Sequence, residues 1–239
     1  MVGLGLKLAV VPARYGSRRV PKKNLRSFLG RPLLEWTIVA ALESGCFDRV
    51  CLSTDSEELA RIGEECGAEV PFLRENFADD EAPVARATAE MATRVFAESG
   101  KNNGTVAQLL PVCPLRTSAH VITVMDFFAA MECGDSVVSA SKFLFQPPWW
   151  AAVCDQELRP TYLHPESLKS RSQDLPQALS PNGAIWVSDF ASLVEYNTFY
   201  SPGHKLFEIP WVAGLDIDTE DDFRLAEIVG TNRAYLENT

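Results

Sequence analysis

The chain has 239 residues, of which 46% are hydrophobic and 23% charged, and its formal net charge is −10. That length and apolar content allow one substantial core, and the acidic charge argues against a general nucleic-acid-binding surface. With no apolar run long enough to cross a bilayer and no charged-then-apolar leader, we expect no membrane association and a cytoplasmic protein.

The first predicted strand, residues 7–11, runs into a loop with an unusual density of cations. Six of the 22 Lys and Arg residues fall between Arg14 and Arg26. Ligands of open α/β sheets bind at the carboxyl ends of such strands, where Gly16 lets the backbone approach and Ser17 offers a hydroxyl. On an acidic chain this loop predicts a site for a polyanion such as a phosphorylated ligand, with a merely solvated charged loop as the alternative.

Strands and helices then alternate through the first 140 residues. The spacing of apolar residues predicts strands over 49–53, 69–72, 106–110 and 136–140. Helices are predicted over 33–43, over a stretch that begins at a capping box of Asp55 and Glu58 and ends at Gly67, and over 84–98 and 119–131. This order implies an α/β fold, with a mostly parallel, Rossmann-like sheet covered by helices on both faces.

The alternation stops at Ser141. From there to about Pro181 the chain has no clean helical period, and the segment opens with Phe143, Phe145, Pro147, Pro148, Trp149 and Trp150. We expect residues 141–182 to form an extension, and residues 1–140 and 183–239 to form the α/β domain. An aromatic flap folded onto its own domain is the alternative.

The last chemical feature is an acidic run over residues 216–222. Alternation along an extended strand end places Asp216 and Asp218 on one side, where both carboxylates can present hard oxygen ligands to a metal. Thr219 is the predicted N-cap of a helix over residues 220–228. The alternative is that the whole run only caps and charges the start of that helix.

The cation loop carries a long and specific pattern. Pro12-Ala13-Arg14 is followed by Gly16-Ser17 and, after the loop, by Lys23-Asn24. This pattern resembles the N-terminal signature of the CMP-sialic acid synthetases, or acylneuraminate cytidylyltransferases. The similarity covers essentially the whole chain, because it continues through residues 30–33, 53–55, 67–74, 114–116, 171–176, 182–185 and 216–219.

The resemblance implies a nucleotide-diphospho-sugar transferase fold and a reaction in which CTP and an acidic nine-carbon sugar give a CMP-sugar and pyrophosphate. It implies catalytic roles for Arg14 and Lys23, Mg²⁺ held by Asp216 and Asp218, and a homodimer in which residues 141–182 help build the partner's sugar pocket. The implied nucleotide-binding residues are Pro12, Ala13, Arg14, Gly16, Ser17, Lys23, Asn24 and Arg74, and the implied sugar-binding residues are Leu110, Arg171, Gln173 and Asn182. Taken singly, Arg74 could be a surface cation, and Gln173 and Asn182 could be turn residues.

Two departures from the family concern the substrate. Leu110 replaces a glutamine that contacts the sugar in the family, which favours a less hydroxylated sugar, because an isobutyl group cannot replace the amide's hydrogen bonds. Residues 80–84 lack the Ser or Thr that the family often places there. We expect a bacterial-type nonulosonic acid, with a Kdo-activating enzyme or a non-catalytic nucleotide-binding protein of the same fold as alternatives.

Overall fold

The computed structural model describes residues 5–17, 19–75, 83–131, 135–143 and 146–232. The helices are α1 (Leu33–Glu43), α2 (Glu57–Glu65), α3 (Val84–Ser99), α4 (Ser118–Ala129), α5 (Phe190–Tyr196) and α6 (Glu220–Thr231). The strands are β1 (Leu6–Pro12), β2 (Ser27–Phe28), β3 (Arg31–Pro32), β4 (Arg49–Ser53), β5 (Gly104–Gln108), β6 (Ser136–Lys142), β7 (Ala152–Cys154), β8 (Pro160–Tyr162), β9 (Leu179–Asp189) and β10 (Lys205–Glu208).

Six of these strands form the central sheet, in the order β10-β6-β9-β5-β1-β4. The pairs β1–β4, β1–β5 and β10–β6 are parallel, whereas β9 runs antiparallel to both β5 and β6. The expected mostly parallel sheet is confirmed. Because β1 and β5 are adjacent and parallel, the loops that follow them open at the same edge of the sheet.

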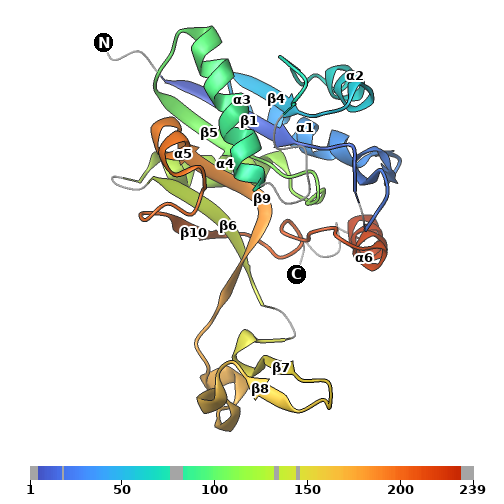
Figure 1. Ribbon diagram of the computed structural model, residues 1–239, viewed down its shortest axis with the longest axis vertical. Helices are drawn as coiled ribbons and strands as arrows, with labels where there is room; N and C mark the ends of the chain where they lie inside the picture. The colour runs from blue at the N-terminus through green and yellow to red at the C-terminus, as the bar shows by residue number, and fades with distance from the viewer. Residues whose placement is uncertain (1–4, 18, 76–82, 132–134, 144–145, 233–239) are drawn as a thin grey trace.

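Helices cover both faces of the sheet (Figure 1). On one face α3 and α5 lie together, joined by the Phe96 and Phe190 rings, which stack with centroids 3.8 Å apart. On the other face, apolar side chains of α1 and α4, among them Ala41, Val121 and Val124, pack against β5, β6 and β9. β1 is buried from both sides, since only Lys7 among its residues is exposed. This double burial explains the continuous apolar run of that strand in the sequence.

Two local predictions are wrong. Residues 69–72 form no strand, because only Glu69 makes an isolated bridge, to Cys51 of β4. The N-cap of α2 is Ser56, whose side chain accepts from the Leu59 N–H, and not Asp55. Asp55 is used elsewhere, since its carboxylate accepts from the backbone N–H of Tyr15 at 2.9 Å. Asp55 therefore forms a tertiary hydrogen bond with the cation loop, although the local sequence pattern predicted that it would cap α2.

A small lobe stands apart from the sheet, below it in Figure 1. The strands β6 and β9 lead to it side by side, with Ser141 paired to Ser180 and Lys142 to Leu179. Within the lobe β7 and β8 form a hairpin, and the indole N–H of Trp149 donates to the Pro176 carbonyl at 2.7 Å. The lobe lies within residues 141–182; its role in dimerisation stays a prediction. None of the helices in the described ranges is long and apolar enough to span a membrane.

Candidate active site

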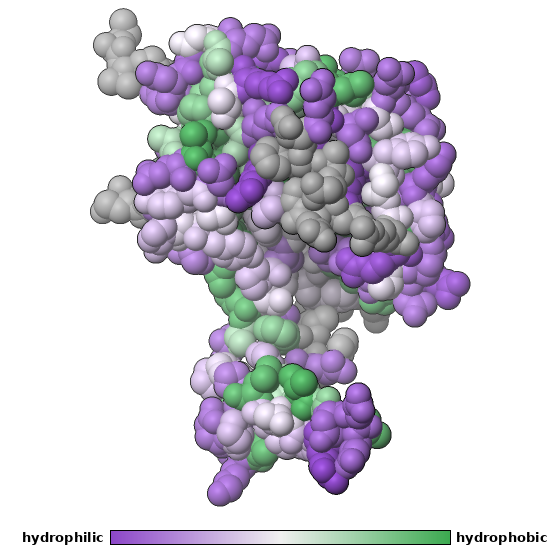
Figure 2. Space-filling model, in the orientation of Figure 1, coloured by the Kyte–Doolittle hydropathy of each residue, from purple (hydrophilic) through white to green (hydrophobic). Residues whose placement is uncertain are grey.

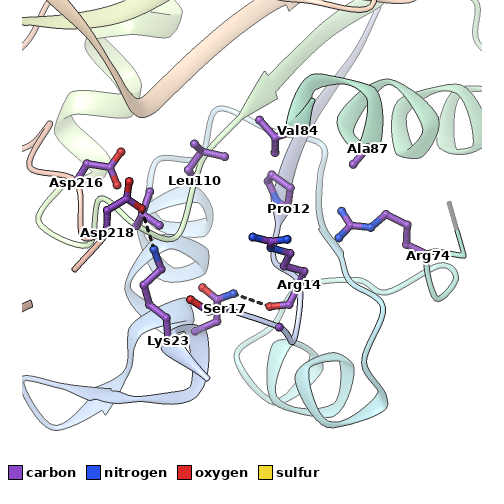
Figure 3. Close-up of a pocket in the computed structure, with 13 residues that line it drawn as sticks. Pro12, Arg14, Ser17, Lys23, Arg74, Val84, Ala87, Leu110, Asp216 and Asp218 are labelled. Carbon is purple, nitrogen blue, oxygen red and sulfur yellow. Dashed lines mark hydrogen bonds and ion pairs between the residues drawn. The ribbon is translucent and has the colours of Figure 1, made fainter. Parts of the chain in front are cut away.

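A cleft of about 290 Å³ opens at the carboxyl ends of β1 and β5 (Figure 3). One side of its wall is polar and the other is apolar. The polar side chains come from the cation loop, the acidic run and the segment after β4. The polar lining residues are Arg14, Ser17, Lys23, Asn24, Arg74, Asp216 and Asp218, and the apolar ones are Pro12, Val84, Ala87, Leu110 and Val112. Gly16 also lines the cleft, whereas Ala13 is buried beneath the loop. The structure thus gathers all but one of the predicted nucleotide and metal residues around one space.

The cation loop is held by hydrogen bonds at its base. Ala13 N–H donates to the Ser53 carbonyl at 2.9 Å, which continues the pairing of β1 with β4. The Asn24 side-chain amide donates to the Arg14 carbonyl at 3.0 Å (Figure 3). A Cβ placed on Gly16 would meet nothing within 4 Å, so no other part of the described structure packs on the loop there. Asn24 therefore braces the loop as well as lining the cleft.

Lys23 joins the cation loop to the acidic run. Its side chain is buried, and Nζ donates to the Ile217 carbonyl at 2.5 Å and to Asp218 Oδ1 at 3.3 Å. Arg19 donates to the other oxygen of Asp218 at 2.8 Å. Two cations thus face one carboxylate in this structure, and segments almost 200 residues apart in the sequence meet at the cleft.

The acidic run is an extended loop, not the strand end that alternation predicted. Alternation still holds locally, because Ile217 is buried in the core while Asp216 and Asp218 line the cleft. The Ile217 N–H donates to the Val112 carbonyl at 2.9 Å, which fixes the loop against the segment after β5. The predicted N-cap is confirmed, since Thr219 forms a capping box with Asp222, and α6 extends beyond residue 228 to Thr231.

The two carboxylates of the acidic run differ in environment. Asp216 is an exposed residue, but its carboxyl lies against the cleft walls, and this partial desolvation, with the nearby Asp218 charge, raises its pKa to about 6. No cluster of three His, Cys, Asp or Glu side chains that could hold a metal occurs among the described residues. Mg²⁺ commonly takes one or two protein carboxylates and completes its shell with phosphate oxygens and water. Asp216 and Asp218 fit such a site.

Arg74 is not a surface cation, because it is only 6% exposed. Its Nη1 is 3.5 Å from the Ser53 hydroxyl, and its buried Nε has no hydrogen-bond partner in the described structure. Burial lowers the pKa of the guanidinium below its ordinary value. A buried donor beside a cleft is costly unless a ligand or water satisfies it, so this side chain is suited to a ligand acceptor.

The four residues predicted to bind the sugar are not brought together within one chain. Leu110 lines the cleft, and Asn182 lines an adjoining cavity of about 630 Å³ that shares Asp216 with it. Arg171 and Gln173 lie in the lobe, where both are exposed and Arg171 pairs with Asp174 at 2.7 Å. Neither of them lines either cavity.

Sequence reasoning gave no role to Arg116, which holds the back of the cleft. The residue is 2% exposed, and its guanidinium donates to the Ala184 carbonyl at 2.5 Å, the Leu110 carbonyl at 3.3 Å and the Thr37 hydroxyl at 2.5 Å. Burial lowers its pKa to about 10. It ties the loop after β5 to β9 and α1. The only sequence signal was its place in a shared motif, because nothing local marks an arginine as buried.

The comparisons with known proteins agree in finding similarity to enzymes that use cytidine nucleotides. A family model described as cytidylyltransferase matches residues 8–100. The chain is 32% identical to a pseudaminic acid cytidylyltransferase of Campylobacter jejuni, over 93% of this chain and 95% of that protein. It is 31% identical to a CMP-N,N'-diacetyllegionaminic acid synthase of Legionella pneumophila, over 92% and 94%.

Among solved structures, a CMP-2-keto-3-deoxy-manno-octonic acid synthetase complexed with CTP superposes with a TM-score of 0.68 at 16% identity, covering 95% of this chain and 99% of that one. At this level of identity the likeness concerns the fold alone. It confirms the α/β, nucleotidyltransferase-type fold that the resemblance implied.

Replacing Arg116 by Met should lower the free energy of unfolding by about 2–4 kcal/mol, because the Ala184 and Leu110 carbonyls lose a charged donor. Urea unfolding followed by tryptophan fluorescence measures this loss. Arg224→Met is the control, since that side chain is 72% exposed and its loss should change stability by less than about 0.5 kcal/mol. Equal losses in the two variants would show that Arg116 is not a buried anchor.

Proposed function

The chain belongs to the cytidylyltransferase family, and from this premise we propose that it transfers CMP from CTP to an acidic nine-carbon sugar of the nonulosonic class. The observation that carries the proposal is the cleft, in which a cation loop at the end of β1 faces a pair of carboxylates. Relatives that match this chain over nine-tenths of its length include proteins named for pseudaminic, legionaminic and N-acylneuraminic acids.

In the proposed reaction the anomeric hydroxyl oxygen attacks the α-phosphorus of CTP. A new P–O bond forms, the bond to the β-phosphate oxygen breaks, pyrophosphate leaves with that electron pair, and the hydroxyl proton is released. Such a transfer depends on positioning and charge neutralisation more than on a covalent nucleophile. The cleft supplies both, since it combines fixed cations with a loop braced by Asn24 and Asp55.

We assign a role to each side chain of the polar wall. Arg14 and Lys23 offset the charge of the triphosphate and of the leaving pyrophosphate, while Ser17 and the Gly16 backbone hold phosphate oxygens. Arg74, whose side chain lines the cleft, donates to the nucleoside part of CTP. Asp216 and Asp218 would hold Mg²⁺, which supplies further charge neutralisation at the phosphates when bound.

The acid sugar is assigned to the cavity lined by Asn182, because that cavity borders the CTP cleft at Asp216. Leu110 lies on the cleft side and offers an apolar contact where a polar side chain would select hydroxyl groups. This composition favours a deoxygenated sugar. The reaction needs CTP, which is supplied in the cytoplasm, so a cytoplasmic location belongs to the same proposal.

A second subunit completes the proposed enzyme. Large apolar side chains are exposed on the lobe, among them Val153, Leu158 and Leu163, and Figure 2 shows apolar surface on it. Apolar side chains grouped on a surface in this way are typical of a site that another protein covers. We place a second copy of the chain there, in a symmetric homodimer, so that Arg171 and Gln173 approach the partner's sugar cavity.

The reaction is tested by pyrophosphate release from CTP and Mg²⁺ with N-acetylneuraminic, legionaminic, pseudaminic and Kdo sugars, followed by mass analysis of the products. We expect turnover with one nonulosonic acid and a loss of about 100-fold in kcat for Asp218→Asn. Asp221→Asn is the control, because that side chain is 91% exposed in the first turn of α6 and does not line the cleft. Turnover with Kdo alone supports the alternative sugar, and CTP binding without turnover on any sugar supports a non-catalytic protein.

Leu110→Gln should shift preference toward the more hydroxylated N-acetylneuraminic acid, since the amide can hydrogen-bond a sugar hydroxyl that an isobutyl group cannot. The ratio of kcat/KM values between that sugar and the preferred one should change by about tenfold. Leu110→Met, similar in volume and without an amide, should leave the ratio unchanged. An unchanged ratio in both variants would remove Leu110 from the specificity determinants.

The double variant Val153→Asp, Leu163→Asp should convert a dimer to a monomer in sedimentation velocity, because two charges would enter the proposed contact. It should also lose sugar turnover while it keeps CTP binding. Leu225→Asp, on the exposed face of α6 at 47% exposure, is the matched control and should stay dimeric. A wild-type monomer would exclude the proposed assembly.

A further inference from the structure

The pairing of β6 with β9 is interrupted once, just above the lobe. Val138 pairs with Trp186, whereas Ala140 pairs with Pro181, so residues 182–185 of β9 stand opposite Ser139 alone. An insertion of this kind leaves backbone groups unpaired and needs other partners to fix its shape. The bulge lies where both strands leave the body of the protein for the lobe (Figure 1).

The Asn182 side chain supplies those partners. Its Oδ1 accepts from the Ser139 hydroxyl at 2.7 Å and from the Ala184 N–H at 3.2 Å, and its Nδ2 donates to the Ser141 hydroxyl at 3.0 Å. The Ser139 oxygen also accepts from the Ile185 N–H at 2.9 Å. One amide and one buried hydroxyl thus fix the shape of the bulge.

The bulge in turn holds one wall of the cleft. The Gly183 carbonyl accepts from the Leu110 N–H at 3.1 Å, and the Ala184 carbonyl accepts from Arg116 at 2.5 Å. The Leu110 side chain packs so closely on Gly183 that a Cβ there would lie 2.7 Å from Leu110 Cδ1. The bulge is therefore in direct contact with both the backbone and the side chain of Leu110.

The same amide supports the loop that carries Asp216. A Cβ on Gly214 would lie 2.3 Å from Asn182 Nδ2, so the Gly214 backbone rests directly on the amide. The Ser141 hydroxyl, which accepts from Asn182, donates to the Ile209 carbonyl at 3.1 Å. Asp216 is thereby fixed on its N-terminal side by Asn182, as Ile217 fixes it on the other side through the Val112 carbonyl.

We propose that Asn182 is a positioning residue, which sets Leu110 and Asp216 relative to each other by holding the β9 bulge. The proposal rests on the proposed function for the reaction that these two residues serve. It differs from the sugar-binding role implied by resemblance, because Asn182 acts through its contacts with Ser139 and Gly214. It also ties the site to the strands that carry the lobe.

Ser139→Ala tests the proposal, because Ser139 is fully buried and lines neither cavity. Ser139→Ala and Asn182→Ala should each lower kcat by about tenfold, with the KM for the sugar changed less than twofold. The double variant should be no worse than the more damaged single one, since both remove the same network. Each single variant should also weaken CTP binding in the presence of Mg²⁺, measured by titration calorimetry without any sugar.

Ser136→Ala is the matched control, because Ser136 is an equally buried serine of β6 that donates to the Phe199 carbonyl away from the bulge. It should lose stability but keep kcat and CTP affinity. Loss of stability alone in Ser139→Ala, or a raised sugar KM confined to Asn182→Ala, would overturn the proposal. If the wild type binds CTP but turns over no sugar, the proposed function fails, and the calorimetric comparison still decides whether Asn182 positions the nucleotide site.

Discussion

The bridge between Lys23 and the acidic run is the interaction on which the cleft depends. The buried Lys23 ammonium donates to the Ile217 carbonyl and to Asp218. It thereby joins the cation loop to the segment that leads into α6, on one side of the cleft. A buried cation is unfavourable without such partners. Here the partners come from the acidic run, so each segment adds to the anchors that hold the other.

The distribution of charge around the cleft suits the phosphates of the proposed nucleotide ligand. On a chain of net charge −10, most of the surface repels a triphosphate, while the cation loop attracts it. Asp218 is held between Arg19 and Lys23, and Asp216 stands in a partly desolvated position where its pKa is raised to about 6. Ligand phosphates would pair with the cations of the loop. A divalent cation would pair with the carboxylates and with the phosphates.

The strands β6 and β9 link the site to the lobe. The two strands that carry the lobe are the same two that form the Asn182 bulge, and the bulge carbonyls hold Leu110 and Arg116. Residues of the lobe that the resemblance assigned to sugar binding lie outside both cavities of their own chain. This placement agrees with the proposed homodimer, in which these residues would approach the partner's sugar cavity.

The sequence by itself determined the alternation of strands and helices, the place of the cation loop after β1, and the N-cap at Thr219. These depend on local periodicity and on side chains that bond to nearby backbone, which a linear pattern records. It also predicted most of the cleft lining, partly because ligands bind at the carboxyl ends of parallel strands, where the cation loop lies, and partly through the resemblance of its motifs to a known family. Only the tertiary structure decided that Asp55 braces the loop instead of capping α2, and that Arg116 is buried. It also decided that Asn182 fills a bulge, since these roles depend on partners distant in sequence, and no local pattern specifies them.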